Sequence, residues 1–177
     1  ESIRSDTIMA SIMHANNEIG VIHPLTEIGH ICKKHEIIFH VDAAQSIGKI
    51  PVDIKEMKID LLSISAHKIY GPKGVGALFI RYKNPKVELK PIMYGGGHER
   101  GIRPGTLPVH NIVGFGEACR IAKNIMDEES EKIKNMRDKL MVMIQNSIPN
   151  TTINGSHDHR LPGNLNMSFP RTNNEAI

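Results

Sequence analysis

Three short apolar runs of this sequence are each followed at once by polar, chemically reactive side chains. The polar segments are HANNEIG (His14–Gly20), HVDAAQS (His40–Ser46) and SAHKIYGPKG (Ser65–Gly74). A charged group such as Asp42 or Lys68 is costly to bury at the tip of an apolar strand unless it is paired with an opposite charge. Burial also favours the neutral lysine amine, which is the nucleophilic form. One such strand end could be purely structural, but three indicate a shared site.

A fourth polar segment is rich in glycine. GGGHERGIRPGT (Gly95–Thr106) contains Arg100, Arg103 and a hydroxyl at Thr106. Exposed backbone N–H groups, guanidinium groups and a hydroxyl are suited to a phosphate or a carboxylate. A glycine loop by itself is weak support, because it can equally form an irregular turn.

A lysine, an acid and a phosphate-binding loop together match the requirements of pyridoxal 5'-phosphate. The lysine forms a Schiff base, the acid keeps the pyridine nitrogen protonated, and hydrogen-bond donors hold the phosphate. Alternatives remain for each residue. Asp42 could cap the next helix, Lys73 competes with Lys68, and His67 could be a satisfied core histidine. His157 and His159 are interpreted as a polar turn and not as metal ligands, because no further ligand cluster accompanies them.

The surrounding elements alternate between strand and helix patterns. Strands separated by crossover helices predict an α/β fold with a mostly parallel sheet flanked by helices. In such sheets, ligands bind beyond the carboxyl ends of the strands, where the polar segments lie. The predicted strands are 7–13, 36–42, 60–65 and 75–82, and the predicted helices are 25–35 and 53–58.

The pattern changes after Pro108. Residues 109–148 are helical, with Ile133, Met136, Leu140 and Ile144 on one apolar stripe. Short strands and turns follow over 151–169. We therefore predict two parts, 1–125 from a large cofactor-binding domain and 126–177 from the start of a small α+β domain.

Composition narrows the possible partners. The net charge is only +3 and aromatic residues make up 4%, so neither electrostatics nor base stacking favours nucleic-acid binding. No apolar run approaches the roughly 20 residues that a membrane span requires. With two cysteines, Cys32 and Cys119, a disulfide framework is not expected and a reducing compartment is the default.

Four long motifs in register resemble one family. MHANNEIGVIHPL, HVDAAQSIGKIPVD, SAHKIYGPKGVGALF and GGGHERGIRPGTLPVHNIVGFGEA are similar to those of cysteine desulfurases of IscS/NifS type. These are class V, fold-type I pyridoxal-phosphate enzymes. The resemblance covers essentially the whole chain, and implies that the chain corresponds to the central portion of such an enzyme.

The resemblance assigns roles to individual residues. Lys68 would be the Schiff-base lysine, Asp42 the partner of the pyridine nitrogen, and Gln45 a hydrogen-bond partner of the ring's phenolic oxygen. The resemblance further places Asn17 near that oxygen and the substrate carboxylate, Ser65 and His67 at the phosphate, and Thr106 at the phosphate of the neighbouring subunit in a homodimer.

The activity that the resemblance implies is conversion of L-cysteine to L-alanine, with sulfur left as a persulfide on an enzyme cysteine. Iron–sulfur scaffold proteins and sulfur acceptors for tRNA thiolation would be the partners, in the cytoplasm or a mitochondrial matrix. The family's persulfide cysteine lies on a loop beyond NLNMSFP, and Cys32 and Cys119 are expected to be structural. The alternatives are a selenocysteine lyase and an inactive truncated or split product that acts at most as an interaction module.

Overall fold

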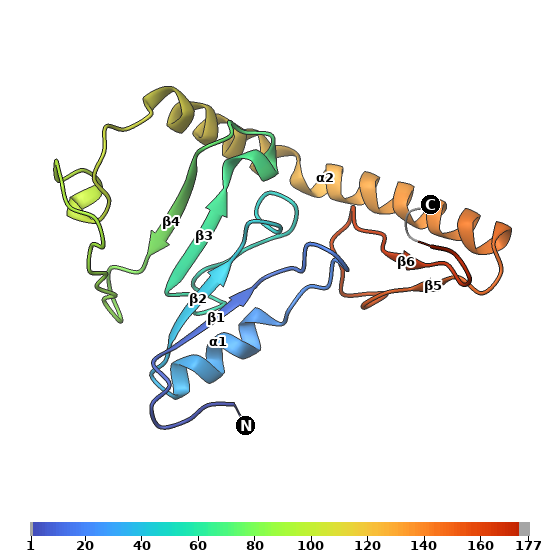
Figure 1. The fold of residues 1–177 in the computed structure, drawn as a ribbon, viewed down its shortest axis with the longest axis horizontal. Helices are drawn as coiled ribbons and strands as arrows, with labels where there is room; N and C mark the ends of the chain where they lie inside the picture. Colours follow the sequence, from blue (N-terminus) through green and yellow to red (C-terminus); the bar gives the residue numbers. More distant parts are fainter. Residues whose placement is uncertain (1, 174–177) are drawn as a thin grey trace.

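A four-stranded sheet forms the centre of the protein, in the order β1-β2-β3-β4 (Figure 1). The computed structural model describes residues 2–173. Strands β1 (Met9–Met13), β2 (Ile38–Asp42) and β3 (Leu61–Ser65) are parallel, and β4 (Gly76–Ile80) is antiparallel to β3. The prediction of a mostly parallel sheet with flanking helices is confirmed.

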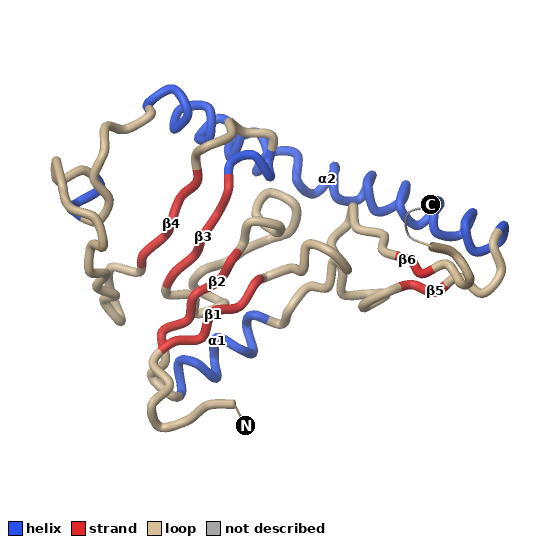
Figure 2. The backbone as a smooth tube through the Cα atoms, in the orientation of Figure 1, coloured by secondary structure: helices blue, strands red, loops and turns tan. Residues whose placement is uncertain are grey.

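Helices occupy the predicted positions with one exception. The chain over 53–58 was predicted to be a short helix, which is wrong: it forms only a turn, closed by Met57 N donating to Asp53 O at 3.0 Å. Six residues form too few helical hydrogen bonds to offset the free-energy cost of nucleating a helix, and Lys58 leaves the helical region with φ 54°. The remaining elements are α1 (Leu25–Lys34), η1 (Ala66–Ile69), η2 (Glu99–Gly101), α2 (Val109–Ser147), β5 (Thr152–Ile153) and β6 (Met167–Ser168) (Figure 2).

Alternation along the strands builds the hydrophobic core. Phe39 and Val41 on β2 are 0% exposed, and α1 contributes Leu25 and Cys32 to the same cluster. A second, smaller cluster joins Phe115 of α2 to Ala66 and Ile69 of η1. This second cluster fixes α2 beside the turn that follows β3, which is the turn that carries Lys68.

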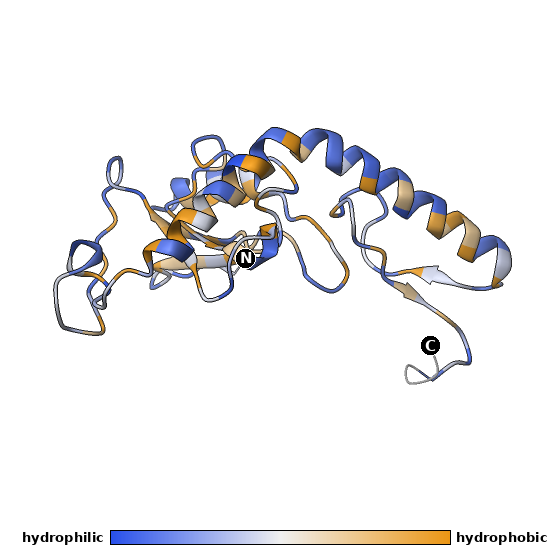
Figure 3. Ribbon diagram, turned by 90° about the horizontal axis from the view of Figure 1, so that it is seen from above, coloured by the Kyte–Doolittle hydropathy of each residue, from blue (hydrophilic) through white to orange (hydrophobic). Residues whose placement is uncertain are grey.

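Helix α2 is long and continuous, and its first half packs on η1 while its second half lies beside β5 and β6 (Figure 1). The predicted division between 1–125 and 126–177 falls inside this helix and stays a prediction. Of the apolar stripe, Ile133 and Ile144 are half-buried, whereas Met136 and Leu140 are 64% and 51% exposed. Apolar residues are accordingly visible along α2 among the hydrophilic ones (Figure 3).

Within the described residues, no helix combines the length and apolar character that crossing a membrane requires.

Candidate active site

The three parallel strands bring their carboxyl ends to one edge of the sheet. Met13 is in register with Asp42, and Asp42 in turn with Ser63. The polar segments that follow β1, β2 and β3 therefore leave the sheet side by side. This placement is the one that parallel topology predicts for a ligand site.

A cavity of about 480 Å³ opens at this edge, lined by Asn17, Gln45 and Lys68 from the three segments. Its volume falls within the roughly 300–1,000 Å³ of small-molecule sites. Lys68 lies on η1, and its side chain is half-buried. Helix α2 adds an apolar wall made of Ala118, Ile121, Ala122, Ile125 and Ile133.

Asp42 lies beside this cavity, not inside it. It lines a neighbouring hollow of about 110 Å³ together with Asn17 and Gln45. We expected a buried carboxylate here, which is wrong: Asp42 is exposed, and its Oδ1 accepts a hydrogen bond from Ala44 N at 2.9 Å. The last side chain of a strand points away from the packed layer when its neighbours Val41 and Ala43 occupy the core.

The three predicted phosphate ligands are separated from that cavity. Ser65 Oγ and His67 Nδ1 lie 3.1 Å apart, so they form one polar pair at the end of β3. Thr106 is exposed at the end of the Gly95–Thr106 loop, which lies beyond β4 (Figure 1). A single chain thus brings together Asn17, Gln45 and Lys68, with Asp42 adjacent, but not Thr106.

A second lysine on the cavity was not singled out from the sequence. Lys49 lines the same space as Lys68, opposite Glu129 and Ser130 of α2, and Ser130 Oγ donates to Lys49 O at 2.6 Å. Burial, and then repulsion from Lys68, lower the pKa of Lys49. No local pattern marks Lys49, because it follows β2 by seven residues and reaches the cavity only through the turns of 43–50.

His14 is a buried histidine immediately beside the site. It is 3% exposed, its Nδ1 has no hydrogen-bond partner among residues 2–173, and its main-chain N donates to Asp42 O at 2.8 Å. Burial, reinforced by the nearby His23, lowers the pKa of His14 to about 4. His14 is therefore neutral at physiological pH and contributes to packing at the end of β1.

The two cysteines lie outside both cavities. Cys32 is 3% exposed in the core, and burial followed by the charge of Asp60 raises its pKa. Cys119 is half-buried on α2, and burial raises its pKa as well. A sulfur-attacking cysteine must be a thiolate with access to the substrate, so both have the wrong environment.

The sequence profile of the aminotransferase class-V family matches residues 1–177. The chain belongs to this family. It is 57% identical over 176 residues to the cysteine desulfurase IscS of Tolumonas auensis, a match that covers 99% of this chain and 43% of that protein. The chain thus spans less than half the length of this relative, and its resemblance to the IscS/NifS type is confirmed.

Solved structures agree with the fold. A NifS-like protein from Rickettsia africae matches with a TM-score of 0.89 and 36% identity, over 96% of this chain and 46% of that one. The protein SspA, solved in complex with cysteine, matches with a TM-score of 0.79 and 39% identity, over 99% of this chain and 47% of that one. The sheet and helices are therefore those of a fold-type I large domain.

Proposed function

We propose that this chain forms the central part of a pyridoxal-phosphate-dependent cysteine desulfurase, which converts L-cysteine to L-alanine and passes the sulfur to an enzyme cysteine as a persulfide. The observation that carries the proposal is the cavity at the sheet edge, where Lys68 meets Asn17 and Gln45 beside Asp42. The IscS relative and the cysteine complex of SspA support the choice of substrate.

The side chains around the cavity fit the cofactor by their chemistry. Lys68, Asn17 and Gln45 line a space of suitable volume, the Asp42 carboxylate lies in the adjoining hollow, and the hydroxyl–imidazole pair at the end of β3 suits a phosphate. Lys68 would hold the cofactor through Nζ, Asp42 the ring nitrogen, Gln45 and Asn17 the phenolic oxygen, and Ser65, His67 and Thr106 the phosphate.

Pyridoxal phosphate, when bound, supplies a ring that accepts the electron pair left at the substrate's Cα. The chain's own contribution is to place and move protons. Nζ of Lys68, once free, accepts the proton from Cα. The Asp42 carboxylate keeps the ring nitrogen protonated, and the amide of Asn17 orients the substrate carboxylate. The apolar wall of α2 limits access of water to the reacting atoms.

The sulfur acceptor is proposed to lie outside this chain's 177 residues. Cys32 is packed in the core, and Cys119 of α2 is half-buried and lines neither cavity.

A homodimer is the second part of the proposal. Thr106 does not line the cavity of its own chain, and the segment before its loop exposes apolar side chains: Ile92 is 91% and Tyr94 85% exposed. Exposed apolar side chains that cluster in this way mark interaction sites. We infer that the loop binds the phosphate in the neighbouring subunit. The further partners that we propose are iron–sulfur scaffold and sulfur-acceptor proteins in the cytoplasm.

Chemical labelling tests the assignment. The protein is incubated with pyridoxal phosphate, reduced with borohydride, and mapped by mass spectrometry of peptides. We expect the cofactor's mass on Lys68 and its loss in Lys68→Ala. Lys49→Ala is the matched control, because Lys49 lines the same cavity. Label on Lys49 or Lys73 in place of Lys68 would refute the assignment.

Alanine production from L-cysteine is measured on the same preparations with dithiothreitol added, so that a thiol is present to accept the sulfur. Activity on L-selenocysteine alone would indicate the lyase, and a labelled protein without either activity would indicate an inactive product. The names of the relatives favour the desulfurase over both.

A further inference from the structure

The loop that presents Asn17 is held by a segment from the other end of the chain. Besides its own turn, in which Asn16 Oδ1 accepts from Glu18 N and Ile19 N at 2.9 Å, the loop pairs with residues 154–166. Main-chain contacts come first: Val21 and Arg160 form a β-bridge, Ile22 N donates to His159 O at 3.0 Å, and Leu161 N donates to Gly20 O at 2.9 Å. In addition, the side chain of Asn164 donates through Nδ2 to Glu18 O at 2.9 Å.

This docking is close. Gly20 has a φ of +72°, and a Cβ added there would lie 2.4 Å from Cγ of Asn164. Asn164 and Leu161 also line the main cavity, so the segment forms one of its walls. The wall and the Asn17 loop are therefore a single packed unit.

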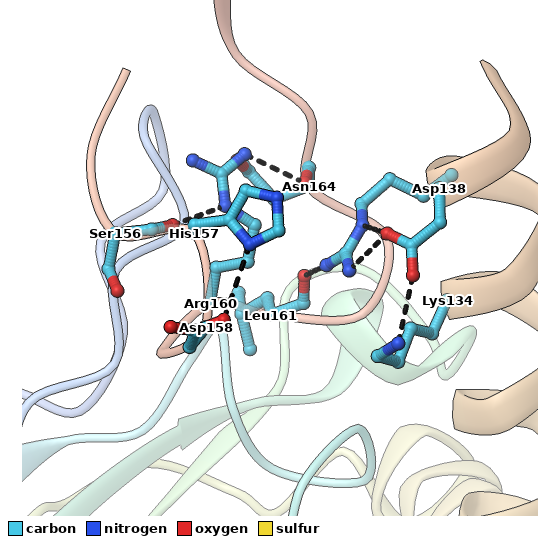
Figure 4. Close-up of polar contacts among 9 residues, drawn as sticks. Lys134, Asp138, Ser156, His157, Asp158, Arg160, Leu161 and Asn164 are labelled. Carbon is cyan, nitrogen blue, oxygen red and sulfur yellow. Dashed lines mark hydrogen bonds and ion pairs between the residues drawn. The ribbon is translucent and has the colours of Figure 1, made fainter. Parts of the chain in front are cut away.

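Arg160 holds this segment from within. Only 6% of the residue is exposed, and its guanidinium donates to three main-chain carbonyls, of which Figure 4 shows those of Ser156 and Asn164. Nε donates to Ser156 O at 2.8 Å, Nη1 donates to Asn164 O at 3.3 Å, and Nη2 donates to Asn154 O. The segment is irregular, so these carbonyls have few other donors, and the planar five-donor guanidinium can satisfy several of them at once.

A second arginine links the same wall to the helix. Arg137 on α2 donates through Nη1 to Leu161 O at 3.2 Å, and its Nη2 lies 2.6 Å from Asp138 Oδ1 (Figure 4). By contrast, Arg160 has no carboxylate partner among residues 2–173, so its charge is balanced by carbonyl dipoles alone. Its role is thus to shape main chain and not to form an ion pair.

We propose that Arg160 is a positioning residue for the active site: by ordering residues 154–164 it fixes the loop that places Asn17 beside Lys68. The inference rests on the proposed function and deepens it. Arg160 touches neither cavity, and so it acts through the segment and the loop.

The test uses Arg160→Lys in the holoenzyme, since lysine keeps the charge but cannot reach three carbonyls. Backbone hydrogen exchange is measured by mass spectrometry. We expect exchange in peptides covering 16–22 and 156–164 to become about tenfold faster or more, with β2 and β3 unchanged. The matched control is Arg120→Lys, an exposed arginine of α2 paired with Glu117, which should change neither region.

Kinetics separates positioning from simple support. Arg160→Lys should lower kcat/KM for L-cysteine about ten- to a hundredfold, because small misplacements of a substrate-orienting group are costly. Asn17→Ala should lower it as well, and the double variant should be no worse than Asn17→Ala alone. Additive losses, or unchanged exchange at 16–22 in Arg160→Lys, would overturn the proposal.

Two outcomes need separate handling. If Arg160→Lys also accelerates exchange in β2 and β3, the double variant Asn164→Ala/Asn166→Ala replaces it, which removes both carboxamides that donate to Glu18 O and leaves Arg160 in place. Unchanged exchange at 16–22 in that variant counts against the proposal. If Asn17→Ala keeps full activity, the assignment of Asn17 fails, whereas the exchange experiment still decides whether Arg160 holds the loop.

Discussion

The edge of the sheet and the Gly95–Thr106 loop are both rich in ligand-binding groups, yet they are supported very differently. At the edge, Asn17, Gln45 and Lys68 follow strands whose side chains fill the core, and α2 closes the cavity from the side. In the described structure the loop lines neither cavity, and its hydrogen bonds are internal, among them Gly101 N donating to His98 O at 3.0 Å and Gly105 N donating to His98 Nδ1 at 3.3 Å. One half of the proposed site is thus built by a single chain, whereas the proposed role of the loop requires a partner subunit.

The largest effect should come from the edge. In the proposed mechanism Lys68→Ala removes both the attachment point of the cofactor and the base at Cα, and we expect kcat to fall by about 10³-fold or more. Cysteine-dependent alanine formation is the measurement. Lys49→Ala, on the same cavity, is expected to retain most activity; an equal loss in both variants would mean that Lys68 has no special role.

Because the hydrophobic core supports the sheet edge but not the loop, substitutions in the two regions should differ in their effect on the free energy of unfolding. Phe39→Ala empties a fully buried position of β2 and should lower the free energy of unfolding by about 3–5 kcal/mol. Tyr94→Ala, 85% exposed next to the loop, should change the free energy of unfolding of the single subunit by about 0.5 kcal/mol or less. Urea unfolding at a fixed protein concentration measures both, and equal losses would contradict the contrast between the two regions.

The edge should also be the acid-sensitive region. The pKa of His14 is lowered from 6.5 to about 4 by burial and by His23, so the unfolded chain takes up this proton before the folded one. The stabilisation from neutral His14 is complete above pH 6.5 and is lost as the pH falls towards 4, on the order of 3 kcal/mol in all.

Unfolding midpoints at pH 7 and pH 4.5 test this. His14→Gln should show a smaller loss between the two pH values than the unchanged protein, whereas His110→Gln, exposed on α2, should not. Parallel losses in the two variants would place the acid sensitivity elsewhere.

The smallest expected effects are those of replacing the proposed phosphate ligands, and these effects best distinguish the sheet edge from the loop. Ser65→Ala and Thr106→Ala should each weaken cofactor binding by about 1.5–3 kcal/mol, the contribution of a hydrogen bond to a charged group. Mixed dimers then separate the two. A Thr106→Ala subunit paired with a Lys68→Ala subunit contains one intact site and should regain activity.

Ser65→Ala paired with Lys68→Ala contains no intact site, because both residues come from one chain. Titration of cofactor absorbance and of activity in these mixtures is the measurement. Recovery in the Ser65 mixture, or none in the Thr106 mixture, would contradict the assignment of the loop to the partner.

Prediction from sequence succeeded where the signal was local. Strands and helices repeat with periods of two and 3.6 residues, and the motif following each strand carries its own chemistry, so β1–β4, α1 and three residues of the cavity, Asn17, Gln45 and Lys68, could be named in advance. The turn over 53–58 shows the limit of the method, because a run of six residues satisfies a helical pattern without being long enough to form a helix.

The sequence by itself thus determined the elements, the family and the side chains that meet at the sheet edge. Only the tertiary structure decided that Asp42 is exposed, that Lys49 shares the cavity with Lys68, and that Arg160 holds the loop of Asn17. The physical reason is how far apart in sequence the interacting residues are. Whether a residue belongs to a strand depends mostly on adjacent residues. The exposure of one carboxylate and the pairing of Val21 with Arg160 depend on residues distant in sequence, which no local periodicity predicts.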